Sequence, residues 1–497
     1  MKNTHNCNKI MPYVEFTRKE IDDAAKNNRL LTLEIEFSIR CNLRCQYCYV
    51  PDQISTEKEL TKKEIRSVIL QAEQLGARKI IILGGEPMFY PHILEMIKFI
   101  KSRKMKVEMF TNGFQITANV AKQLADYGVN VVLKMSSFNE NIEDMLCGQK
   151  GASKMIWDAF HNLKAAGYPA KKNSLSISAV ICRQNVDELI NMWQWSREQG
   201  IDPYFEMLTP QGHAMQNEWL NVSPARLHEL FSEISKIDRL HYNKTWNPQP
   251  PLVGGRCLRH QFSCLVNSYG NVTACVGVPI PVGNIREKNL SDIIKDSEVI
   301  QDLRNYRSTI KDPCRSCEKV ENCYGCRGAA YQLTGDYLAA DPMCWKNTDR
   351  QSEIVFLPTA VNSMIPQQVT MRVIDTIDKV EERIVEVSVT VSKDMPFVNE
   401  DGIVDEVVYI EFIAQAIAAL DGFKKAGASG EKPEGFLLGV KNLEIFDHAK
   451  IGDKLRITAF KYAQYEAFGV VKGHVYHGNK LLAQGEIKIW HDTSCRE

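Results

Sequence analysis

The stretch "CNLRCQYCY", Cys41–Tyr49, gathers three cysteines within nine residues and directly follows a strand-like segment. Three residues separate the first two thiols and two residues separate the last two. An iron–sulfur cubane usually takes four protein thiolates, so three thiolates leave one iron without a ligand from the chain. An open iron is a place to bind and activate another molecule. The spacing therefore predicts a catalytic cluster.

The segments around this loop alternate between strand-like and helix-like patterns up to about residue 240. Residues 31–39 alternate with period two, residues 61–76 form a capped helical pattern, and residues 79–85 form a short apolar strand. About six such β/α units predict a parallel sheet with right-handed crossovers. In a parallel barrel, chemistry gathers at the carboxyl ends of the strands. The cysteine loop, "GGEP" (84–87) and "TNG" (111–113) follow or end the first three strands.

"CNLRCQYC" with "GGEP" one β/α unit later resembles the radical S-adenosylmethionine (SAM) enzymes over residues 31–240. The resemblance implies an α/β fold with a partial (β/α)6 barrel. It implies that Cys41, Cys45 and Cys48 ligate a [4Fe–4S] cluster and that SAM chelates the open iron. Reductive cleavage of SAM would give methionine and a 5′-deoxyadenosyl radical, which abstracts hydrogen from a substrate. The alternative is a zinc site, although structural zinc usually takes four protein ligands.

The same resemblance implies a set of SAM contacts in the barrel. The expected cofactor contacts are Tyr47, Gly84, Gly85, Glu86, Pro87, Ser136 and Asn185. The glycines would permit close backbone approach, and Glu86 would accept from the SAM amino group. Tyr47 would lie near the adenine, whereas Ser136 and Asn185 would contact the ribose or the carboxylate. A serine or asparagine at a strand end is also a common cap or turn residue, and that alternative stays open.

Eight further cysteines follow between residues 257 and 344, and their spacing resembles the SPASM extension of radical SAM enzymes. The resemblance implies two auxiliary [4Fe–4S] clusters. The first would be held by Cys257, Cys264, Cys275 and Cys326, and the second by Cys314, Cys317, Cys323 and Cys344. The family usually has three residues between the last two cysteines of "CRSCEKVENCYGC", whereas this chain has two, so the split between Cys323 and Cys326 stays open. The alternative is one or two structural zinc ions.

Two features bear on the reaction. In sulfatase-maturing SPASM enzymes an aspartate base follows the third auxiliary cysteine, but here the residue is Val276, which argues against that activity. The roughly 30 residues before the first strand are too few for the leader-binding domain of peptide-modifying relatives. At the end of the sixth strand, Glu206 is the candidate catalytic residue, with Gln211 and His213 nearby, and each also has a structural interpretation.

The last region combines one long apolar helix, which contains Tyr409–Phe423, with several long alternating strands. It resembles the hotdog fold, and more closely the acyl-carrier β-hydroxyacyl dehydratase-like proteins, whose helix carries a catalytic glutamate. Glu411 and Gln415 match that helix, four residues apart on one face. The preceding loop, 392–408, has no histidine, and "IPQQ" at 365–368 stands where relatives have "PH". A glutamate without its partner lacks half of the acid–base pair, so we expect acyl recognition or dimerisation, with residual dehydratase activity of Glu411 as the alternative.

Composition limits the remaining function classes. The 497 residues carry 61 basic and 61 acidic side chains, with no basic stripe that predicts nucleic-acid binding. We find no apolar run of about 18 residues and no secretory signal, which predicts a cytoplasmic protein. In a reducing compartment most of the 15 cysteines are better explained as metal ligands than as disulfides. The expected partners are a ferredoxin- or flavodoxin-type electron donor, an acyl carrier protein and a second copy of the chain.

The sequence thus predicts four regions: an N-terminal extension (1–30), a radical SAM barrel (31–245), a cysteine-rich SPASM domain with little regular structure (246–350) and an α+β hotdog domain (355–497). The first functional hypothesis is hydrogen abstraction from an acyl-type substrate that the hotdog domain presents. The second is modification of a peptide or protein side chain, with the hotdog domain only dimerising. The third is an acyl-binding protein whose clusters are structural or sense redox state, and an intact "GGEP" argues against it.

Overall fold

The computed structural model describes residues 15–50, 57–347, 357, 359–361, 364–367, 371–380, 383–426, 435–465 and 467–491. The chain divides into two compact units. The first unit contains Met1–Met215 and Val222–Asn347, and the second contains Gln216–Asn221 and Thr348–Glu497.

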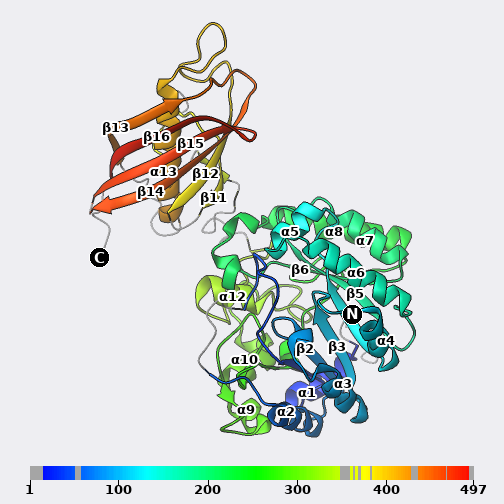
Figure 1. Ribbon diagram of the computed structural model, residues 1–497. Helices are drawn as coiled ribbons and strands as arrows, with labels where there is room; N and C mark the ends of the chain where they lie inside the picture. The colour runs from blue at the N-terminus through cyan, green and yellow to red at the C-terminus, as the bar shows by residue number, and fades with distance from the viewer. Residues whose placement is uncertain are drawn as a thin grey trace. The chain divides into compact units, whose positions relative to one another are not determined.

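The first unit is built on six parallel strands that pair in chain order (Figure 1). They are β1 (Thr32–Glu36), β2 (Lys79–Leu83), β3 (Lys106–Thr111), β4 (Val129–Lys134), β5 (Leu175–Ile181) and β6 (Asp202–Met207). The helices of the crossovers are α2 (Lys62–Gln74), α3 (Ile93–Ser102), α4 (Ala118–Asp126), α6 (Ala152–Ala165) and α7 (Leu189–Glu198). The structure adds α1 (Arg18–Lys26), α5 (Glu140–Cys147) and α8 (Pro224–His241), which the sequence patterns did not predict. The predicted partial (β/α)6 barrel is confirmed.

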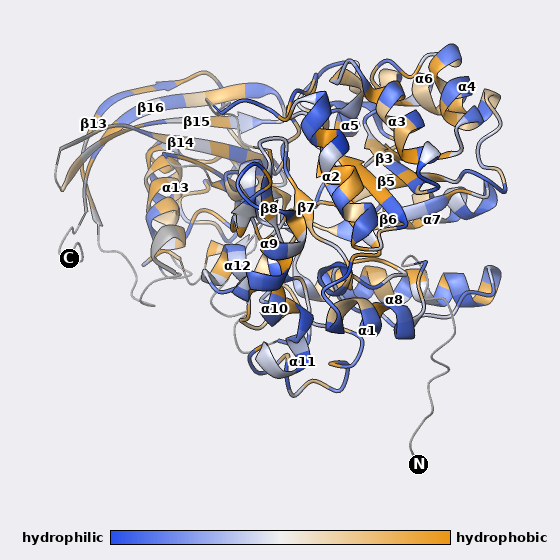
Figure 2. Ribbon diagram, turned by 90° about the horizontal axis from the view of Figure 1, so that it is seen from below, coloured by the Kyte–Doolittle hydropathy of each residue, from blue (hydrophilic) through white to orange (hydrophobic). Residues whose placement is uncertain are grey.

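Local sequence explains these elements. Helix α2 begins after Thr61, whose hydroxyl accepts from the backbone of Glu64 while the Glu64 carboxylate accepts from the Thr61 backbone, a complete capping box. Along β1, Leu33 and Ile35 are fully buried under the helices, and Glu34 between them lines the interior of the barrel. Figure 2 shows hydrophobic and hydrophilic residues interspersed along α3, α4 and α6, as expected of helices with one covered side.

The cysteine-rich region extends the same sheet. Strand β7 (Leu265–Val266) pairs parallel with β1, and β8 (Asn271–Thr273) and β9 (Gly283–Asn284) continue the sheet as antiparallel strands. Four short helices follow: α9 (Leu290–Asp296), α10 (Glu298–Arg304), α11 (Tyr306–Thr309) and α12 (Arg327–Thr334). The longest of them has eight residues. The prediction of little regular structure is confirmed in that every element here is short.

The second unit packs one long helix, α13 (Val407–Ala426), against a seven-stranded sheet. The strands are β10 (Thr359–Ala360), β11 (Thr376–Val380), β12 (Ile384–Thr390), β13 (Gly435–Ile445), β14 (Lys454–Tyr465), β15 (Phe468–His477) and β16 (Lys480–His491). Their order is β10-β11-β12-β14-β15-β16-β13, with antiparallel pairing throughout. Strand β15 passes so close to helix α13 that a Cβ at Gly473 would lie 2.5 Å from Ile413. The predicted α+β hotdog domain is confirmed, although β10, β11 and β12 were not predicted. Among the described residues, no helix is long and apolar enough to cross a membrane.

Candidate active site

The three-cysteine loop is held from one side by the end of α5. The backbone N–H of Arg44 donates to the carbonyl of Cys147 (3.0 Å), and that of Gln46 donates to the carbonyl of Leu146 (2.9 Å). Helix α5 ends at Gly148 in the left-handed conformation, with φ of 63°. A Cβ there would lie 2.1 Å from the Arg44 carbonyl oxygen, so glycine is required for this close approach.

The segment after β6 holds the loop from another side. The backbone N–H of His213 donates to the carbonyl of Cys48 (2.9 Å), and His213 Nδ1 lies 2.9 Å from the carbonyl oxygen of Cys45. A Cβ at Gly212 would lie 2.4 Å from the Cys48 carbonyl oxygen. His213, one of the candidates at the end of the sixth strand, therefore lies beside the cysteine loop and lines the cavity described below.

The three thiols share one electrostatic environment. Burial raises the pKa of Cys41 to about 11 and that of Cys48 to about 12, and the charge of Cys45 adds to both rises. A hydrogen bond from Cys147 lowers the pKa of Cys45. The amide of Asn112, at the end of β3, lies 3.6 Å from the Cys41 sulfur. These thiols need a positive centre to neutralise them as thiolates, which is what an iron cluster supplies.

The glycines of "GGEP" contact the chain that leads into this loop. The N–H of Gly85 donates to the Ser38 carbonyl at 2.9 Å. A Cβ at Gly84 would lie 2.3 Å from the Ser38 oxygen, and one at Gly85 would lie 2.3 Å from the Arg40 oxygen. Both glycines also line the cavity. Close backbone approach is thus required here between two segments of the protein itself.

Glu86 is fully buried, and its carboxylate joins two strand ends. It accepts from the backbone N–H groups of Met88 (3.0 Å) and Asn112 (2.7 Å) and from the hydroxyl of Thr111 (2.7 Å). Burial raises its pKa to about 7. Glu86 and Pro87 are not among the residues that line the cavity, whereas Asn112 is. In this geometry Glu86 orders the loop and the Asn112 backbone.

Tyr47, Lys134 and Ser136 form a contiguous group at the end of β4. The Tyr47 hydroxyl lies 3.1 Å from Ser136 Oγ, and Lys134 Nζ donates to that oxygen at 2.6 Å and lies 4.5 Å from the Tyr47 ring centroid. Tyr47 and Lys134 line the cavity. Ser136 and Asn185 are fully buried, and the Asn185 amide donates to the carbonyls of Ser136 (2.8 Å) and Val180 (3.0 Å). The structural interpretation of Asn185 as a turn residue thus agrees with its contacts.

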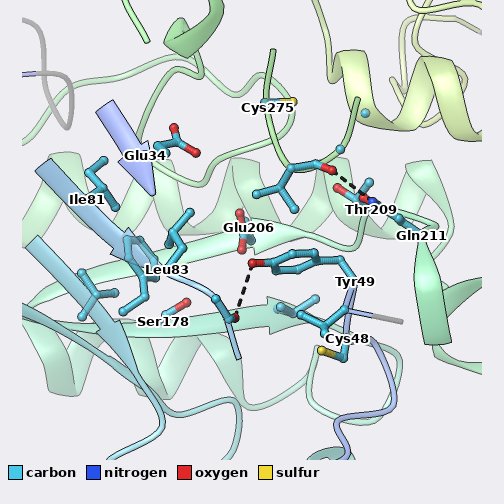
Figure 3. A pocket seen from close by; sticks show the side chains of 18 of the residues that line it. Glu34, Cys48, Tyr49, Ile81, Leu83, Ser178, Glu206, Thr209, Gln211 and Cys275 are labelled. Atoms are coloured by element: carbon cyan, nitrogen blue, oxygen red, sulfur yellow. Dashed lines mark hydrogen bonds between the residues drawn. The ribbon is translucent and has the colours of Figure 1, made fainter. Parts of the chain in front are cut away.

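A cavity of about 910 Å³ occupies the interior of the barrel (Figure 3). Six cysteines line it: Cys41, Cys45, Cys48, Cys257, Cys275 and Cys326. In Figure 3, Cys48 and Cys275 lie on opposite sides, with Glu206 and Tyr49 between them. The cavity therefore connects the three-cysteine loop with part of the later cysteine set.

Glu206 extends into this cavity from β6. Among the described residues, no hydrogen bond or ion pair engages its carboxylate. Burial raises the pKa of Glu206, and the charge of Arg259 opposes the rise. Arg259 itself pairs with Glu34 at 3.3 Å and donates to the Tyr204 hydroxyl at 3.2 Å. A buried carboxylate with unused acceptor oxygens is suited to bind a donor group of a substrate or to take a proton from it.

Gln211 joins the barrel to the cysteine-rich region. Its side-chain amide donates to the carbonyl of Val276 at 3.0 Å (Figure 3), one residue after Cys275. Gln211 and Val276 both line the cavity. This contact positions the turn that carries Cys275.

The later thiols fall into two groups, and the charges of the thiols within each group affect one another's pKa values. After burial, the charges of Cys257 and Cys326 contribute to the pKa of about 12 at Cys275. Burial raises the pKa of Cys344 to about 12, and the charges of Cys323 and Cys314 contribute. Cys317 adds to the raised pKa of Cys323. The structure thus places Cys323 with Cys314, Cys317 and Cys344, and Cys326 with Cys257 and Cys275. In the described residues no three metal-binding side chains could share one ion, so this grouping rests on charge and on the shared cavity.

Cys264 does not join the first group. It is buried, with a pKa of about 12 caused by burial, and its charged neighbours are Arg304 and Glu34. It does not line the cavity.

Arg327 and Asp341 were not predicted, and both lie among the later thiols. Asp341 is fully buried and accepts from the backbone N–H of Cys326 at 2.7 Å. Arg327 donates through Nη1 to the carbonyls of Tyr337 and Ala339, but its buried Nε and Nη2 have no hydrogen-bond partner. Its charge opposes the burial-raised pKa of Cys314. Two orphaned donors near the Cys314 thiol fit the sulfur atoms of a bound cluster.

In the second unit, Glu411 and Gln415 form one hydrogen-bonded pair on α13 (2.7 Å). The Gln415 amide also donates to the carbonyl of Met371 at 2.7 Å and accepts from the N–H of Val373 at 2.9 Å. Among the described residues, no histidine bonds to Glu411. Gln368 of "IPQQ" lies outside the described residues, as do Cys7 and Cys495.

Family comparisons match three parts of the chain. A Radical SAM superfamily model matches residues 35–195, an iron–sulfur cluster-binding SPASM model matches residues 257–318, and a model described as ApeP dehydratase matches residues 359–496. A radical SAM domain binds a [4Fe–4S] cluster and SAM, and a SPASM domain binds auxiliary iron–sulfur clusters. The predicted domain types, their order and their cofactors are therefore confirmed.

Individual relatives each cover somewhat more than three fifths of the chain. The AdoMet-dependent heme synthase of Methanosarcina barkeri is 28% identical over 337 residues, which are 62% of this chain and 94% of that protein. The mycofactocin maturase MftC of Mycolicibacterium smegmatis is 28% identical over 331 residues, 63% of this chain and 82% of that protein. The structure of Streptococcus suis SuiB bound to S-adenosylmethionine superposes with a TM-score of 0.51 at 20% identity, over 66% of this chain and 81% of that one, which shows a common fold.

Proposed function

Because the chain carries a radical SAM domain, a SPASM domain and an ApeP-like dehydratase domain in that order, we propose that it abstracts hydrogen from an acyl or acyl-carrier substrate. The observation that carries this proposal is the single 910 Å³ cavity, which reaches both the three-cysteine loop and later cysteines and contains Glu206. When bound, the cluster and SAM supply a 5′-deoxyadenosyl radical.

The protein's own residues would position these groups. Cys41, Cys45 and Cys48 would hold the cluster, while Tyr47 and the Gly84–Gly85 backbone, which also line the cavity, would border SAM. Glu86 would not contact SAM itself but would order the GGEP loop and the Asn112 backbone. These roles agree with the contacts that each residue makes.

Glu206 would bind or deprotonate the substrate. Its carboxylate is buried, extends into the cavity and is unused by other side chains, which supports this role. The surrounding barrel wall excludes water from the radical.

The acyl assignment derives from the ApeP-like domain. Glu411 is hydrogen-bonded to Gln415, which anchors two backbone groups, so the pair supports a structural more than a catalytic role. We therefore propose that this domain binds the acyl group or its carrier. A ferredoxin- or flavodoxin-type donor would supply the electron, in a cytoplasm reducing enough to keep the thiols available.

A second candidate is modification of a peptide. It is favoured by the similarity of 63% of the chain to the mycofactocin maturase. The domain order 31–245, 246–350 and 355–497 would be the same, but the C-terminal domain would then only dimerise. A redox-sensing acyl-binding protein is the third candidate.

Strand β13 supports self-association of the second unit. It lies at one edge of the sheet and pairs only with β16 in the described part of the unit. It exposes Phe436 (61%) and Leu438 (54%). An unpaired apolar edge strand is a template for pairing with another strand. We propose that two copies of the chain pair β13 with β13.

The test is 5′-deoxyadenosine release by the anaerobically reconstituted, reduced full chain. Acyl-carrier thioesters and cellular peptides are supplied separately. We expect thioesters to stimulate release, and Cys45→Ala to abolish it. Stimulation by peptides alone would reject the acyl assignment, and release by Cys45→Ala would reject radical SAM chemistry.

Glu206→Gln separates substrate handling from SAM cleavage. The amide is isosteric but neither accepts a proton nor carries charge. We expect unstimulated SAM cleavage and iron content equal to wild type, with substrate turnover reduced by at least about 100-fold, the usual contribution of a general base. Unchanged turnover would remove Glu206 from the reaction.

A further inference from the structure

We propose that the segment after β6, Leu208–His213, is a strut that ties the three-cysteine loop to the cavity wall that carries Cys275. Gln211 and His213 are the positioning residues of this strut. Through them, the wall at one end of the cavity sets how tightly the loop at the other end binds SAM. The proposal concerns the coupling between the two ends and does not depend on which substrate the cavity takes.

His213 holds the three-cysteine loop by two bonds. Its backbone N–H donates to the carbonyl of Cys48 at 2.9 Å, and its ring Nδ1 lies 2.9 Å from the carbonyl oxygen of Cys45. A carbonyl oxygen only accepts, so Nδ1 carries the hydrogen and the ring is held in one orientation. A Cβ at the neighbouring Gly212 would lie 2.4 Å from the Cys48 carbonyl oxygen, so the strut backbone packs directly on the loop. Any displacement of this end therefore moves the backbone of two cluster ligands.

Gln211, two residues earlier, holds the opposite wall. Its side chain is buried, and its amide donates to the carbonyl of Val276 at 3.0 Å. Thr209 contacts the same wall, because its hydroxyl lies 4.0 Å from the Cys326 sulfur and its methyl carbon would lie 3.6 Å from a Cβ at Gly277. These contacts attach the strut to the turn that begins at Val276 and to the thiol that lies beside it.

The strut itself is short and stiff. Pro210 fixes one of its backbone dihedral angles. The N–H of Gln211 donates to the carbonyl of Thr209 at 2.8 Å, and the N–H of Ala214 donates to the carbonyl of Gln211 at 3.1 Å. The chain then closes into a 3₁₀ helix over Gly212–Met215. A segment that is constrained in this way transmits a displacement from one end to the other instead of absorbing it.

Both ends of the strut border the same cavity. Thr209, Gln211 and His213 all line it. Figure 3 shows Thr209 and Gln211 on the side of the cavity that runs between Cys275 and Cys48. The strut is therefore a wall shared by the region next to the three-cysteine loop and the region next to the later cysteines. A shift in either cysteine group has a direct route through this wall to the other.

The affinity for SAM reports this coupling. SAM would chelate the iron that the three-cysteine loop presents, so its affinity depends on where the loop holds the cluster. A loop that occupies the binding position for only a fraction of the time binds its ligand more weakly by that fraction. The strut holds the loop in this position only while its other end is bonded to the carbonyl of Val276.

The test measures the dissociation constant of radiolabelled SAM by equilibrium dialysis. It uses the reconstituted full chain in the oxidised state, which does not cleave SAM. Gln211→Met keeps the length and volume of the side chain but cannot donate a hydrogen bond. We expect its iron content to equal that of wild type and its dissociation constant to rise about fivefold, the factor for one hydrogen bond. Gln332→Met is the matched control, because Gln332 donates to the adjacent carbonyl of Gly277 (3.2 Å) from α12 and not from the barrel, and it should leave the constant unchanged.

Variants of His213 test the other end of the strut. His213→Phe removes the ring bond to Cys45 and should also weaken SAM binding about fivefold. His213→Asn, whose amide N–H can reach the same carbonyl, should restore most of the affinity. If both residues act through one strut, the double variant of Gln211→Met and His213→Phe should weaken binding by far less than the product of the two effects, about 25-fold.

Four results would overturn the proposal. The first is an unchanged dissociation constant in Gln211→Met, and the second is an equal rise in Gln332→Met, which would show that the turn only needs any hydrogen bond. The third is a failure of His213→Asn to restore binding. The fourth is a double variant in which the two effects multiply, which would show that the residues act independently. Dialysis needs neither a reductant nor a substrate, so a failed 5′-deoxyadenosine assay would reject the proposed function without affecting this result.

Discussion

Replacing Gly148 with alanine tests whether α5 shapes the three-cysteine loop. The new Cβ would lie 2.1 Å from the Arg44 carbonyl oxygen, whereas real Cβ contacts stay above 3.0 Å. The loop must therefore move by about 1 Å. That shift breaks the hydrogen bonds from Arg44 and Gln46 to the end of α5.

The free-energy cost of Gly148→Ala has two parts, backbone strain and lost hydrogen bonds. The left-handed conformation at Gly148 costs alanine about 1 kcal/mol. Two lost hydrogen bonds cost about 1 kcal/mol each. Gly151 is the matched control, because it is also left-handed (φ of 83°) but a Cβ there meets nothing within 4 Å. Gly151→Ala should therefore cost only the first term.

The difference of about 2 kcal/mol lowers the population of the cluster-competent loop about thirtyfold. We expect Gly148→Ala, reconstituted with limiting iron, to lose the EPR signal that responds to SAM and to keep the auxiliary signals. Gly151→Ala should retain both. Equal loading of the three-cysteine site in the two variants would refute the role assigned to α5.

Three further predictions concern other parts of the chain. Arg327→Gln should lower the midpoint potential of the second auxiliary cluster by about 40 mV, because the loss of one hydrogen bond to the cluster costs about 1 kcal/mol. The potential is measured in an EPR-monitored redox titration, where Arg327→Lys should shift it less. An unchanged potential would contradict the argument from the unpaired donors of Arg327. Leu438→Lys should convert a dimer to a monomer in light scattering, because a charge at the exposed β13 edge blocks strand pairing, and a persistent dimer would place the interface elsewhere. Gln415→Ala should destabilise the second unit by about 2–4 kcal/mol in thermal unfolding, since two buried backbone groups lose their partner. Glu411→Ala should change the stability of this unit little. Equal losses of stability in the two variants would contradict the structural role assigned to Gln415.

The barrel and its cofactor loop were predictable because their signals are local. The cysteine spacing, the alternating strands and the Thr61 cap each lie within a short window of sequence. Glu206 was chosen as a candidate because it stands near the end of the sixth predicted strand, and in the structure it lines the cavity. Its chemical role stays a prediction.

Features that depend on pairing between distant segments were not predictable. Cys264 is buried away from the cavity beside the pairing of β7 with β1, which no cysteine spacing encodes. The carboxylate of Glu86 meets Asn112 only because β2 and β3 end side by side. The orphaned donors of Arg327 depend on how α12 packs among the thiols. The "TNG" run was the one available signal for Asn112.

Strand β1 has consequences for the order in which the protein matures. One of its edges is covered by β2, but the other stays bare until β7, more than 200 residues later, has left the ribosome. The cysteine loop that β1 carries would thus emerge long before its scaffold is complete. We expect cluster delivery to the nascent chain to be unproductive before residue 284, the end of β9, is available. A barrel expressed without its cysteine-rich extension would expose that edge and aggregate, so the two cluster-bearing regions mature as one piece.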